Sequence, residues 1–293
     1  MKSESDNAIA ALVEMVRRET REPLFVDFGL SRRLELAEAE TAAECVRTAV
    51  AERSGLGASI ESIAGGQAVF LGIGSPLTQS TGVGMDGEVT ADDFALLEDF
   101  FFCRGAAVNA ETSPFAHPTL FEHFARHGYR ASEHSSALIR RIESSVCPLP
   151  GPELTIAEVP AEHNETWVQT VSQGFADSFP VTDELRDVMR LFASNPAAKK
   201  YLAFWRGTPA GAGALSIHDE IAGLFGASTL PEFRRRGIQR ELILARLEAA
   251  FRAGCEFALS FALPGTSSER NILRYGFRVA YTRTKFTREL PSV

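Results

Sequence analysis

The sequence lacks the residues from which disulfide frameworks, zinc sites and membrane anchors are built. Its 293 residues include four scattered cysteines, with no Cys-x-x-Cys pair and no histidine at a metal-binding spacing. We therefore expect no disulfide framework and no metal site, and interpret the cysteines as buried free thiols in a reducing compartment. No run reaches the ~18 apolar residues that a membrane span needs, and the N-terminus has no apolar signal core. We expect a cytoplasmic protein that contacts no membrane.

An excess of basic residues is also missing. The formal net charge is −8, whereas general nucleic-acid binding depends on an overall basic surface, so we expect no nucleic-acid partner. A nucleoside triphosphatase is disfavoured because no Gly-Lys-Ser/Thr follows a glycine-rich turn. What the chain does contain is 45% apolar residues, enough to fill the cores of two domains of ordinary size.

The clearest chemical feature is a basic turn between a β-like and a helical segment. Arg234, Arg235 and Arg236 precede Gly237, and residues 238–251 carry apolar side chains at helical spacing. A helix that begins at a glycine directs its unpaired N–H groups and the positive end of its dipole into the preceding turn. The sequence therefore predicts a binding site for a phosphate-like anion.

Three prolines between Cys147 and Pro152 mark a linker, because neither a helix nor a central strand tolerates them. The predicted organisation is a helical extension over residues 1–30, a first domain over 31–146, the linker over 147–152 and a second domain over 153–293.

Periodicity and turn residues predict helices and strands in both halves. In the first half we expect helices over 1–18, from Thr41, from Thr90 and over 117–127, and strands over 33–38, 59–63, 67–73, 81–85, 106–110 and 135–142. In the second half we expect helices over 167–175, 182–192, 238–251 and 267–275, and strands over 154–159, 200–205, 210–217, 221–230, 257–262 and 278–286.

The two halves repeat one order of elements. Each reads helix, glycine, strand, proline, helix, a glycine-aromatic-arginine corner and a last strand, with corners at Gly128-Tyr129-Arg130 and Gly276-Phe277-Arg278. Only the second copy contains the basic turn. We therefore expect the first domain to be a degenerate copy that has lost its phosphate turn.

The basic turn resembles the coenzyme-binding motif of the GNAT superfamily of acyl-coenzyme A dependent N-acyltransferases. That motif, Arg/Gln-x-x-Gly-x-Gly/Ala at a strand-to-helix junction, stands here as residues 234–239, with Gln239 at the usual small position. The similarity covers the element order from Leu154 to Phe286. It implies acetyl-coenzyme A as cofactor and an α/β (α+β) fold with two GNAT-like domains, each a mixed, mostly antiparallel twisted sheet flanked by helices.

The resemblance also implies how the coenzyme is held. Main-chain groups of the strand before the turn would pair with the pantetheine amides like an added strand, and one amide would stabilise the oxyanion. The turn and the start of its helix would hold the pyrophosphate, and the short helix that follows would add contacts. The expected coenzyme-binding residues are Ser228, Thr229, Leu230, Arg234, Arg235, Arg236, Gly237, Ile238, Gln239, Arg240, Ser267 and Asn271.

The family's usual proton donor is a tyrosine four residues before the glycine of the last corner, and Ile272 stands there. The candidates for a catalytic role are Ser268, Asn271 and Tyr281, although helix capping is an equal interpretation for Ser267 and Ser268. Charged turn residues are weaker candidates for the base, because such residues are usually solvated, and a water chain is an alternative. These are Asp177, His218, Asp219, Glu220 and Glu232.

The acceptor is expected to be a primary amine of a small molecule. Asp177, Phe179 and Arg283 are the expected substrate residues, since a carboxylate can meet an ammonium group and a guanidinium a carboxylate. The first domain would then shape the substrate cleft or a homodimer. The alternative is a non-catalytic protein that binds or senses acyl-coenzyme A, a hypothesis motivated by Ile272 and Gln239.

Overall fold

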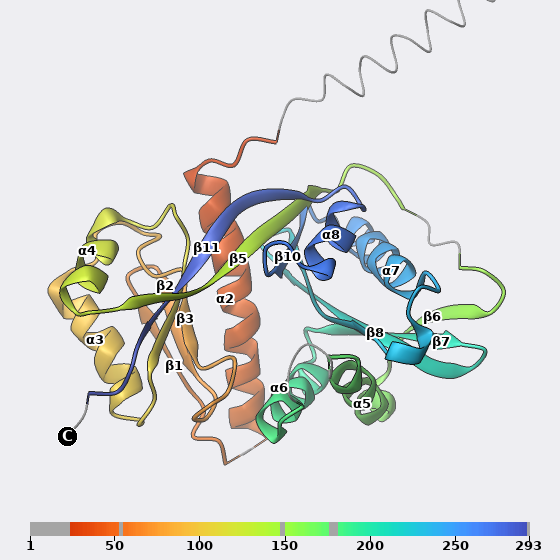
Figure 1. Ribbon diagram of the computed structural model, residues 1–293, viewed down its shortest axis with the longest axis horizontal. Helices are drawn as coiled ribbons and strands as arrows, with labels where there is room; N and C mark the ends of the chain where they lie inside the picture. The colour runs from red at the N-terminus through yellow and green to blue at the C-terminus, as the bar shows by residue number, and fades with distance from the viewer. Residues whose placement is uncertain (1–23, 53–54, 147–149, 176–180, 292–293) are drawn as a thin grey trace, which may run out of the picture.

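One eleven-stranded sheet runs through both halves of the chain (Figure 1). The computed structural model describes residues 24–52, 55–146, 150–175 and 181–291. The strand order is β1-β2-β3-β4-β11-β5-β10-β9-β8-β7-β6, and only the pairs β3–β4 and β9–β10 are parallel. The expected fold class, a mixed and mostly antiparallel sheet flanked by helices, is confirmed. Among the described helices none combines the length and the apolar character needed to cross a bilayer.

The first half confirms most of the predicted elements. The hairpin at Gly65 and Gly66 forms, and a capping box between Thr90 and Asp93 begins the helix predicted there. The third strand is shorter and earlier than expected, and the predicted helix over 1–18 lies outside the described residues. The elements are α2 (Phe28–Ala51), β1 (Ser59–Ile63), β2 (Gly66–Phe70), β3 (Gln79–Thr81), α3 (Ala91–Phe102), β4 (Val108–Thr112), α4 (Pro118–Arg126) and β5 (Arg130–Arg141).

The second half matches its predicted order element by element. Its two 3₁₀ turns precede α5 and α7. The elements are β6 (Leu154–Glu158), η1 (Ala161–His163), α5 (Asn164–Phe175), α6 (Asp183–Ser194), β7 (Lys199–Trp205), β8 (Thr208–His218), β9 (Ile221–Thr229), η2 (Pro231–Phe233), α7 (Ile238–Arg252), β10 (Phe257–Ala262), α8 (Ser267–Leu273) and β11 (Arg278–Arg288).

The last strands of the two halves are exchanged. β5 ends the first half yet pairs with β10 and β11, and β11 ends the second half yet pairs with β4 and β5. Each half also contains one parallel pair before its last strand, so the repeat seen in the sequence reappears in the topology. Separating the halves would therefore break the middle of the sheet.

The helix α2 corrects two sequence predictions. Residues 33–38 are not a strand, and Thr41 does not begin a helix, because both lie inside a 24-residue helix that begins after Asp27. The alternation of Leu34 and Leu36 suggested a strand, but Leu34, Ala37 and Thr41 are buried at helical spacing. In Figure 1 this helix runs through the middle of the molecule, and it contacts strands of both halves.

The helices of the second half cover opposite faces of the sheet, with α5 and α6 on one face and α7 on the other. Leu202 packs with α5 and α6, whereas its neighbour Ala203 packs with α7, and successive strand residues point to opposite faces.

Two cysteines, Cys45 and Cys255, are buried free thiols as expected. Cys103 is exposed at the end of α3, which corrects the prediction that the cysteines are all buried.

A buried charge cluster joins α2 to β11. Tyr281 donates a 2.7 Å hydrogen bond to Glu35, and Arg283, whose side chain is 3% exposed, lies 3.5 Å from the other oxygen of that carboxylate. Arg283 also pairs with Glu38 and approaches Glu111 at 3.7 Å. Burial raises the pKa of Glu35 from 4.5 to about 7, although Arg283 opposes the shift. The protonated form of Glu35 is therefore favoured by folding.

We expect Glu35→Gln to flatten the pH dependence of stability. Because the folded-state pKa is raised, the stability contributed by Glu35 is present below pH 4.5 and is lost as the pH rises through about 7. The wild type should lose roughly 2 to 3 kcal/mol across this window that the variant keeps. Urea unfolding at pH 5 and pH 8 measures the difference, with the exposed Glu52→Gln as control. Parallel pH profiles for wild type and Glu35→Gln would contradict this assignment.

Candidate functional site

The parallel strands β9 and β10 separate to form a fork. They pair only from Ile221–Phe257 to Gly223–Leu259, although β9 continues to Thr229 and β10 to Ala262. We call the gap between residues 224–229 and 260–262 the fork. Its apex is closed by the hydroxyl of Ser260, which donates to the carbonyl of Leu224 at 3.0 Å. Beyond the apex each strand presents an unpaired edge to the other, which an extended ligand could complete.

A β-bulge in β9 opens the fork. The register between β8 and β9 shifts between Ala212 and Ala214, opposite Gly226, whose φ of +56° favours glycine. A Cβ on Gly226 would approach Trp167 to 3.2 Å, and one on Gly213 would approach the guanidinium of Arg246 to 3.1 Å. Because neither glycine has a side chain, Trp167 and Arg246 can pack against the bulge from opposite faces of the sheet.

Those two side chains hold the bulge by hydrogen bonds. Trp167 Nε1 donates to the carbonyl of Gly213 at 3.2 Å, and Arg246 Nη1 donates to the carbonyl of Ala214 at 3.2 Å. Arg246 is fully buried and has no carboxylate partner among the described residues, so desolvation lowers its pKa to about 10. A positive charge thus lies beneath the bulge, in a medium where it acts strongly on nearby developing charge.

The end of β9 presents Thr229 to the fork. Leu230 donates its N–H to Ala210 on β8, so by alternation the main-chain groups of Thr229 point to the other edge. The side chain of Ser228 faces α5, where it donates to the carbonyl of Val171 at 3.1 Å. The hydroxyl of Thr229 is buried and has no hydrogen-bond partner in the described residues. The N–H of Thr229 is therefore directed into the fork, whereas its carbonyl accepts from Arg234 at 3.3 Å.

The basic turn leads directly into an uncapped helix. Arg235 and Gly237 both have positive φ, +63° and +79°, and Gly237 is the N-cap of α7 without any side-chain hydrogen bond. Strained backbone of this kind persists where the surroundings or a ligand require it. Side chains cap five other described α-helices: α2 by Asp27, α3 by Thr90, α4 by His117, α6 by Thr182 and α8 by Thr266. The first N–H groups of α7 are thus open to an external anion.

The four arginines of the turn have different surroundings. Arg234 reaches back to the carbonyl of Thr229 at 3.3 Å and stabilises the end of β9. Arg236 lies over the ring of Trp205 at 4.9 Å, and Arg240 donates to Glu241 at 2.6 Å. Arg235 is exposed and forms no hydrogen bond or ion pair with the described residues. Arg235 and the backbone of the turn are therefore the groups most open to an anion.

The helix α8 contacts the turn through Asn271. Its side-chain N–H donates to Gln239 at 2.8 Å, so the bulky residue at the motif's usual small position is held by α8. Neither Ser267 nor Ser268 caps α8. Thr266 is the N-cap, and both serines are exposed in the first turn of the helix. Ile272, at the usual tyrosine position, is buried in the core.

Several predicted residues lie away from the fork. Tyr281 and Arg283 belong to the buried cluster under α2, so Tyr281 has its hydroxyl on Glu35 and Arg283 is not available to a substrate carboxylate. The turn from His218 to Glu220 lies at the closed end of β9, roughly 25 Å of strand from Thr229. The structure therefore does not bring these three turn residues to the fork. Asp177 and Phe179 lie outside the described residues.

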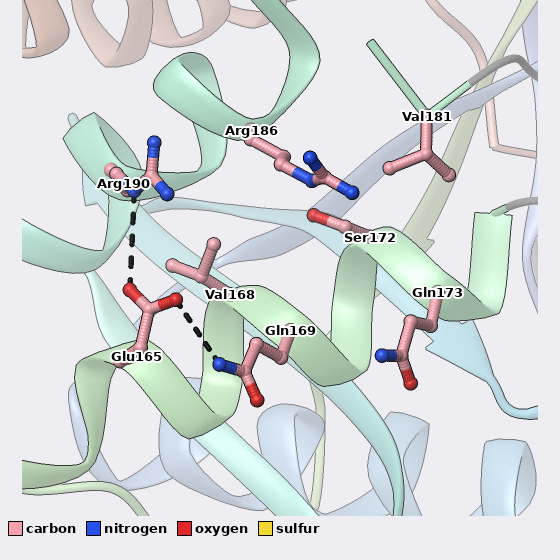
Figure 2. Close-up of a pocket in the computed structure, with 8 residues that line it drawn as sticks. All are labelled: Glu165, Val168, Gln169, Ser172, Gln173, Val181, Arg186 and Arg190. Atoms are coloured by element: carbon pink, nitrogen blue, oxygen red, sulfur yellow. Dashed lines mark hydrogen bonds and ion pairs between the residues drawn. The ribbon is translucent and has the colours of Figure 1, made fainter. Parts of the chain in front are cut away.

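A polar groove runs between α5 and α6 (Figure 2). Its volume is about 470 Å³, and the hydroxyl of Ser172 is buried in its wall with no hydrogen-bond partner among the described residues. Arg186 extends toward Ser172 in Figure 2, and Glu165 contacts Arg190 at 3.9 Å. The sequence reasoning missed this groove because its residues resemble ordinary exposed faces of amphipathic helices. The lining residues are Glu165, Val168, Gln169, Ser172, Gln173, Val181, Arg186 and Arg190.

The matching turn of the first half is closed. Between β3 and α3, the N–H of Gly84 donates to Ala64 and that of Val89 donates to the hydroxyl of Thr119. Asp92 and Asp93 occupy the first turn of α3, where the capping box uses the helix N–H groups. Negative charge and satisfied donors make this turn unsuited to a phosphate.

We expect Gly174→Ala to damage the fork. A Cβ at Gly174 would lie 2.3 Å from Ser228 Oγ and 3.2 Å from the N atom of Thr229, so α5 and β9 must move apart. Overpacking of this kind costs about 1 to 3 kcal/mol. Thermal unfolding measures the loss, and Gly29→Ala, whose Cβ meets nothing closer than 3.5 Å, is the matched control. Equal melting temperatures for Gly174→Ala and Gly29→Ala would show that Gly174 is not tightly packed against Ser228.

Part of the chain matches one family model, and solved structures of low identity share its fold. Residues 164–277, less than half of the chain, match the model of the acetyltransferase (GNAT) family. A search of curated proteins finds no match. Among solved structures, a GCN5-related N-acetyltransferase from Kribbella flavida is similar, with a TM-score of 0.61, 19% identity, and coverage of 85% of this chain and 96% of that one.

Two further structures share the fold. A tandem GNAT protein from the clavulanic acid biosynthesis pathway has a TM-score of 0.56 at 14% identity, covering 88% of this chain and 98% of its own. A GCN5-related N-acetyltransferase from Sphaerobacter thermophilus has a TM-score of 0.51 at 17% identity, covering 64% and 61%. The matched family region runs from α5 to the residue after Gly276, and so contains the fork, the basic turn and Asn271.

Proposed function

We propose that this chain, a GNAT acyltransferase that takes its acetyl group from acetyl-coenzyme A, acetylates the primary amine of a small polar molecule. The observation that carries the proposal is the conjunction of an unpaired fork with an uncapped helix at its open end. The fork suits an extended amide-bearing arm, and the helix suits a pyrophosphate. The residues present therefore fit the coenzyme.

The chain's own groups have distinct roles in holding the donor. When bound, acetyl-coenzyme A supplies a thioester whose carbonyl carbon accepts the amine and whose thiolate leaves. The main-chain N–H of Thr229 would pair with the arm along the edge of β9, and the amides of residues 238–240 with Arg235 would bind the phosphates. Asn271 keeps the side chain of Gln239 bonded to α8. Together these contacts orient the donor rather than react with it.

Groups at the bulge of β9 would stabilise the negative charge that develops on the carbonyl oxygen of the donor during transfer. A main-chain N–H at the bulge can donate to the carbonyl oxygen of the donor, a type of contact typically worth about 3 kcal/mol of barrier. Arg246 lies beneath the bulge as a buried cation and donates to the carbonyls of Ala214 on β8 and Phe225 on β9, which pair directly before the bulge. With Ile272 apolar, the hydroxyl of Thr229, which has no partner among the described residues, would be the candidate to give a proton to the departing thiolate.

The acceptor side is assigned to the α5–α6 face. The groove there has the size of a small-molecule site, and its lining combines both signs of charge with two glutamines. Gly174, two residues after Ser172, packs against Ser228 and Thr229, which links the end of the groove to the mouth of the fork. A small polar amine fits this lining better than an apolar one.

The first half completes the proposal as a degenerate copy without its own coenzyme site. The closed turn before α3 and the acids of its first turn support this role. The division into domains over 31–146 and 153–293 belongs to the same proposal, with the shared sheet uniting them. The first half contributes α2 and β5, which pack against the catalytic half.

We expect one mole of acetyl-coenzyme A to bind per mole of chain. Gly237→Asp adds a carboxylate where phosphate belongs and places a side chain at a φ of +79°, so affinity should fall by at least about tenfold. Isothermal titration calorimetry measures both quantities, with Arg126→Glu on α4 as control. Unchanged affinity in Gly237→Asp would exclude this turn, and two sites per chain would contradict the degenerate first half.

We expect thiol release when small amines are added to the protein with acetyl-coenzyme A. A panel of polar primary amines, followed with a thiol reagent, should contain substrates that release one thiol per amine acetylated. The buried Ile272 favours a second candidate, a protein that binds acyl-coenzyme A without turnover. Tight binding in calorimetry with no release by any amine would support that alternative.

A further inference from the structure

One end of the polar groove between α5 and α6 contains hydrogen-bond donors that lack acceptors. Ser172 lines the groove and is 2% exposed, and its hydroxyl has no hydrogen-bond partner among the described residues. An unpaired polar group in a buried position is costly, so this end of the groove favours a ligand that supplies the partner. The guanidinium of Arg186 extends toward the same serine from α6 (Figure 2).

Arg186 keeps most of its N–H groups for a ligand. Its Nη1 contacts Asp183 at 3.3 Å on the same helix, and the side chain of Asp183 is 90% exposed. An exposed pair of this kind contributes little to stability, and a guanidinium carries five N–H groups in a rigid fork. The N–H groups that do not face Asp183 can therefore bind a second acceptor.

The opposite end of the groove is already paired. Arg190 contacts Asp187 at 2.9 Å, and its Nε lies 3.9 Å from Glu165. These charged groups therefore neutralise one another. Val168 lines the groove between them and the end that contains Arg186, and its apolar side chain suits a methylene chain (Figure 2).

The helix α5 separates the groove from the fork. Ser228 on β9 donates to the carbonyl of Val171, and a Cβ on Gly174 would lie 2.3 Å from Ser228 Oγ, so this side of α5 faces the fork. Ser172 is two residues before Gly174, which places the two about 200° apart around the helix axis. The groove and the fork therefore lie on opposite sides of α5, separated by roughly 10 Å, the diameter of a helix.

We propose that the acceptor is an elongated amine that ends in a carboxylate, such as an ω-amino acid. The carboxylate accepts from Arg186 and from the hydroxyl of Ser172, and the arm places the amine at the mouth of the fork. One guanidinium and one hydroxyl match the single charge and two oxygens of a carboxylate better than a doubly charged phosphate. The inference rests on the proposed function, because it names the acceptor of that reaction.

The transfer step is that of the proposed function. The nitrogen of the uncharged amine bonds to the carbonyl carbon of the thioester, the carbon–sulfur bond breaks, and the proton lost by the amine ends on the sulfur. The carboxylate takes no part in the chemistry and only positions the amine.

Thiol release from acetyl-coenzyme A on the full chain tests the arm and the carboxylate separately. We expect kcat/KM to rise from glycine through 4-aminobutanoate to 6-aminohexanoate, because the shorter acids cannot reach both sites. The amino alcohol 6-aminohexanol has the same length but no carboxylate. Its kcat/KM should be at least about tenfold lower than that of 6-aminohexanoate.

Two variants assign the effect to the groove. Arg186→Gln should lower kcat/KM for 6-aminohexanoate at least about tenfold and leave the value for 6-aminohexanol unchanged. Arg126→Gln, on an exposed arginine that pairs with Glu122 along α4, is the matched control. Ser172→Ala should raise KM for 6-aminohexanoate without lowering the melting temperature, because the hydroxyl has no partner among the described residues. A purely structural hydroxyl would show the reverse.

The carboxylate site and the proposed reaction can fail separately. Equal kcat/KM values for 6-aminohexanoate and 6-aminohexanol, or an unchanged preference in Arg186→Gln, would overturn the carboxylate site and leave the acyltransferase intact. If no amine releases thiol, calorimetry with 6-aminohexanoate decides the groove by itself. Binding that is lost in Arg186→Gln would then overturn the reaction alone, whereas no binding would overturn both.

Discussion

The separation of β9 from β10 is the constraint on which the rest of the site depends. Two glycines, Gly213 and Gly226, let Trp167 and Arg246 approach the bulge from opposite faces and donate to carbonyls of β8 opposite it. These contacts stabilise the separation of β9 from β10, which stop pairing after Gly223. The open edge of β9 leads to the N-terminus of α7, which has no side-chain cap. Main-chain groups of β9 and α7 therefore face the same narrow space.

The charged residues near this space are divided among structural tasks. Arg234 ties the end of β9, Arg246 supports the bulge, and Arg283 neutralises carboxylates under α2. Among the described arginines of the motif all four are exposed, but Arg235 alone forms no hydrogen bond, ion pair or ring contact with the described residues. A run of like residues in a sequence therefore hides separate roles, since each guanidinium takes the acceptors within its own reach.

The sequence predicted the second half well because its signals are local. Thr182 as a cap, Gly237 at a strand-to-helix turn and Gly276 at a corner each act within a few residues. Long-range features were out of reach. The alternation around Leu34 resembled a strand until burial against both halves revealed a helix, and the pairing of Tyr281 with Glu35 spans most of the chain. The strand exchange likewise leaves no trace in composition.

The exchanged strands have a consequence for how the chain is made. β11 follows all the other described strands in the chain, yet it lies between β4 and β5, near the middle of the finished sheet. Until it emerges from the ribosome, β4 has no partner on that side and exposes an edge capable of pairing with another chain. Completion of the sheet therefore waits for β11, which makes it a late step that depends on contacts between residues far apart in the sequence.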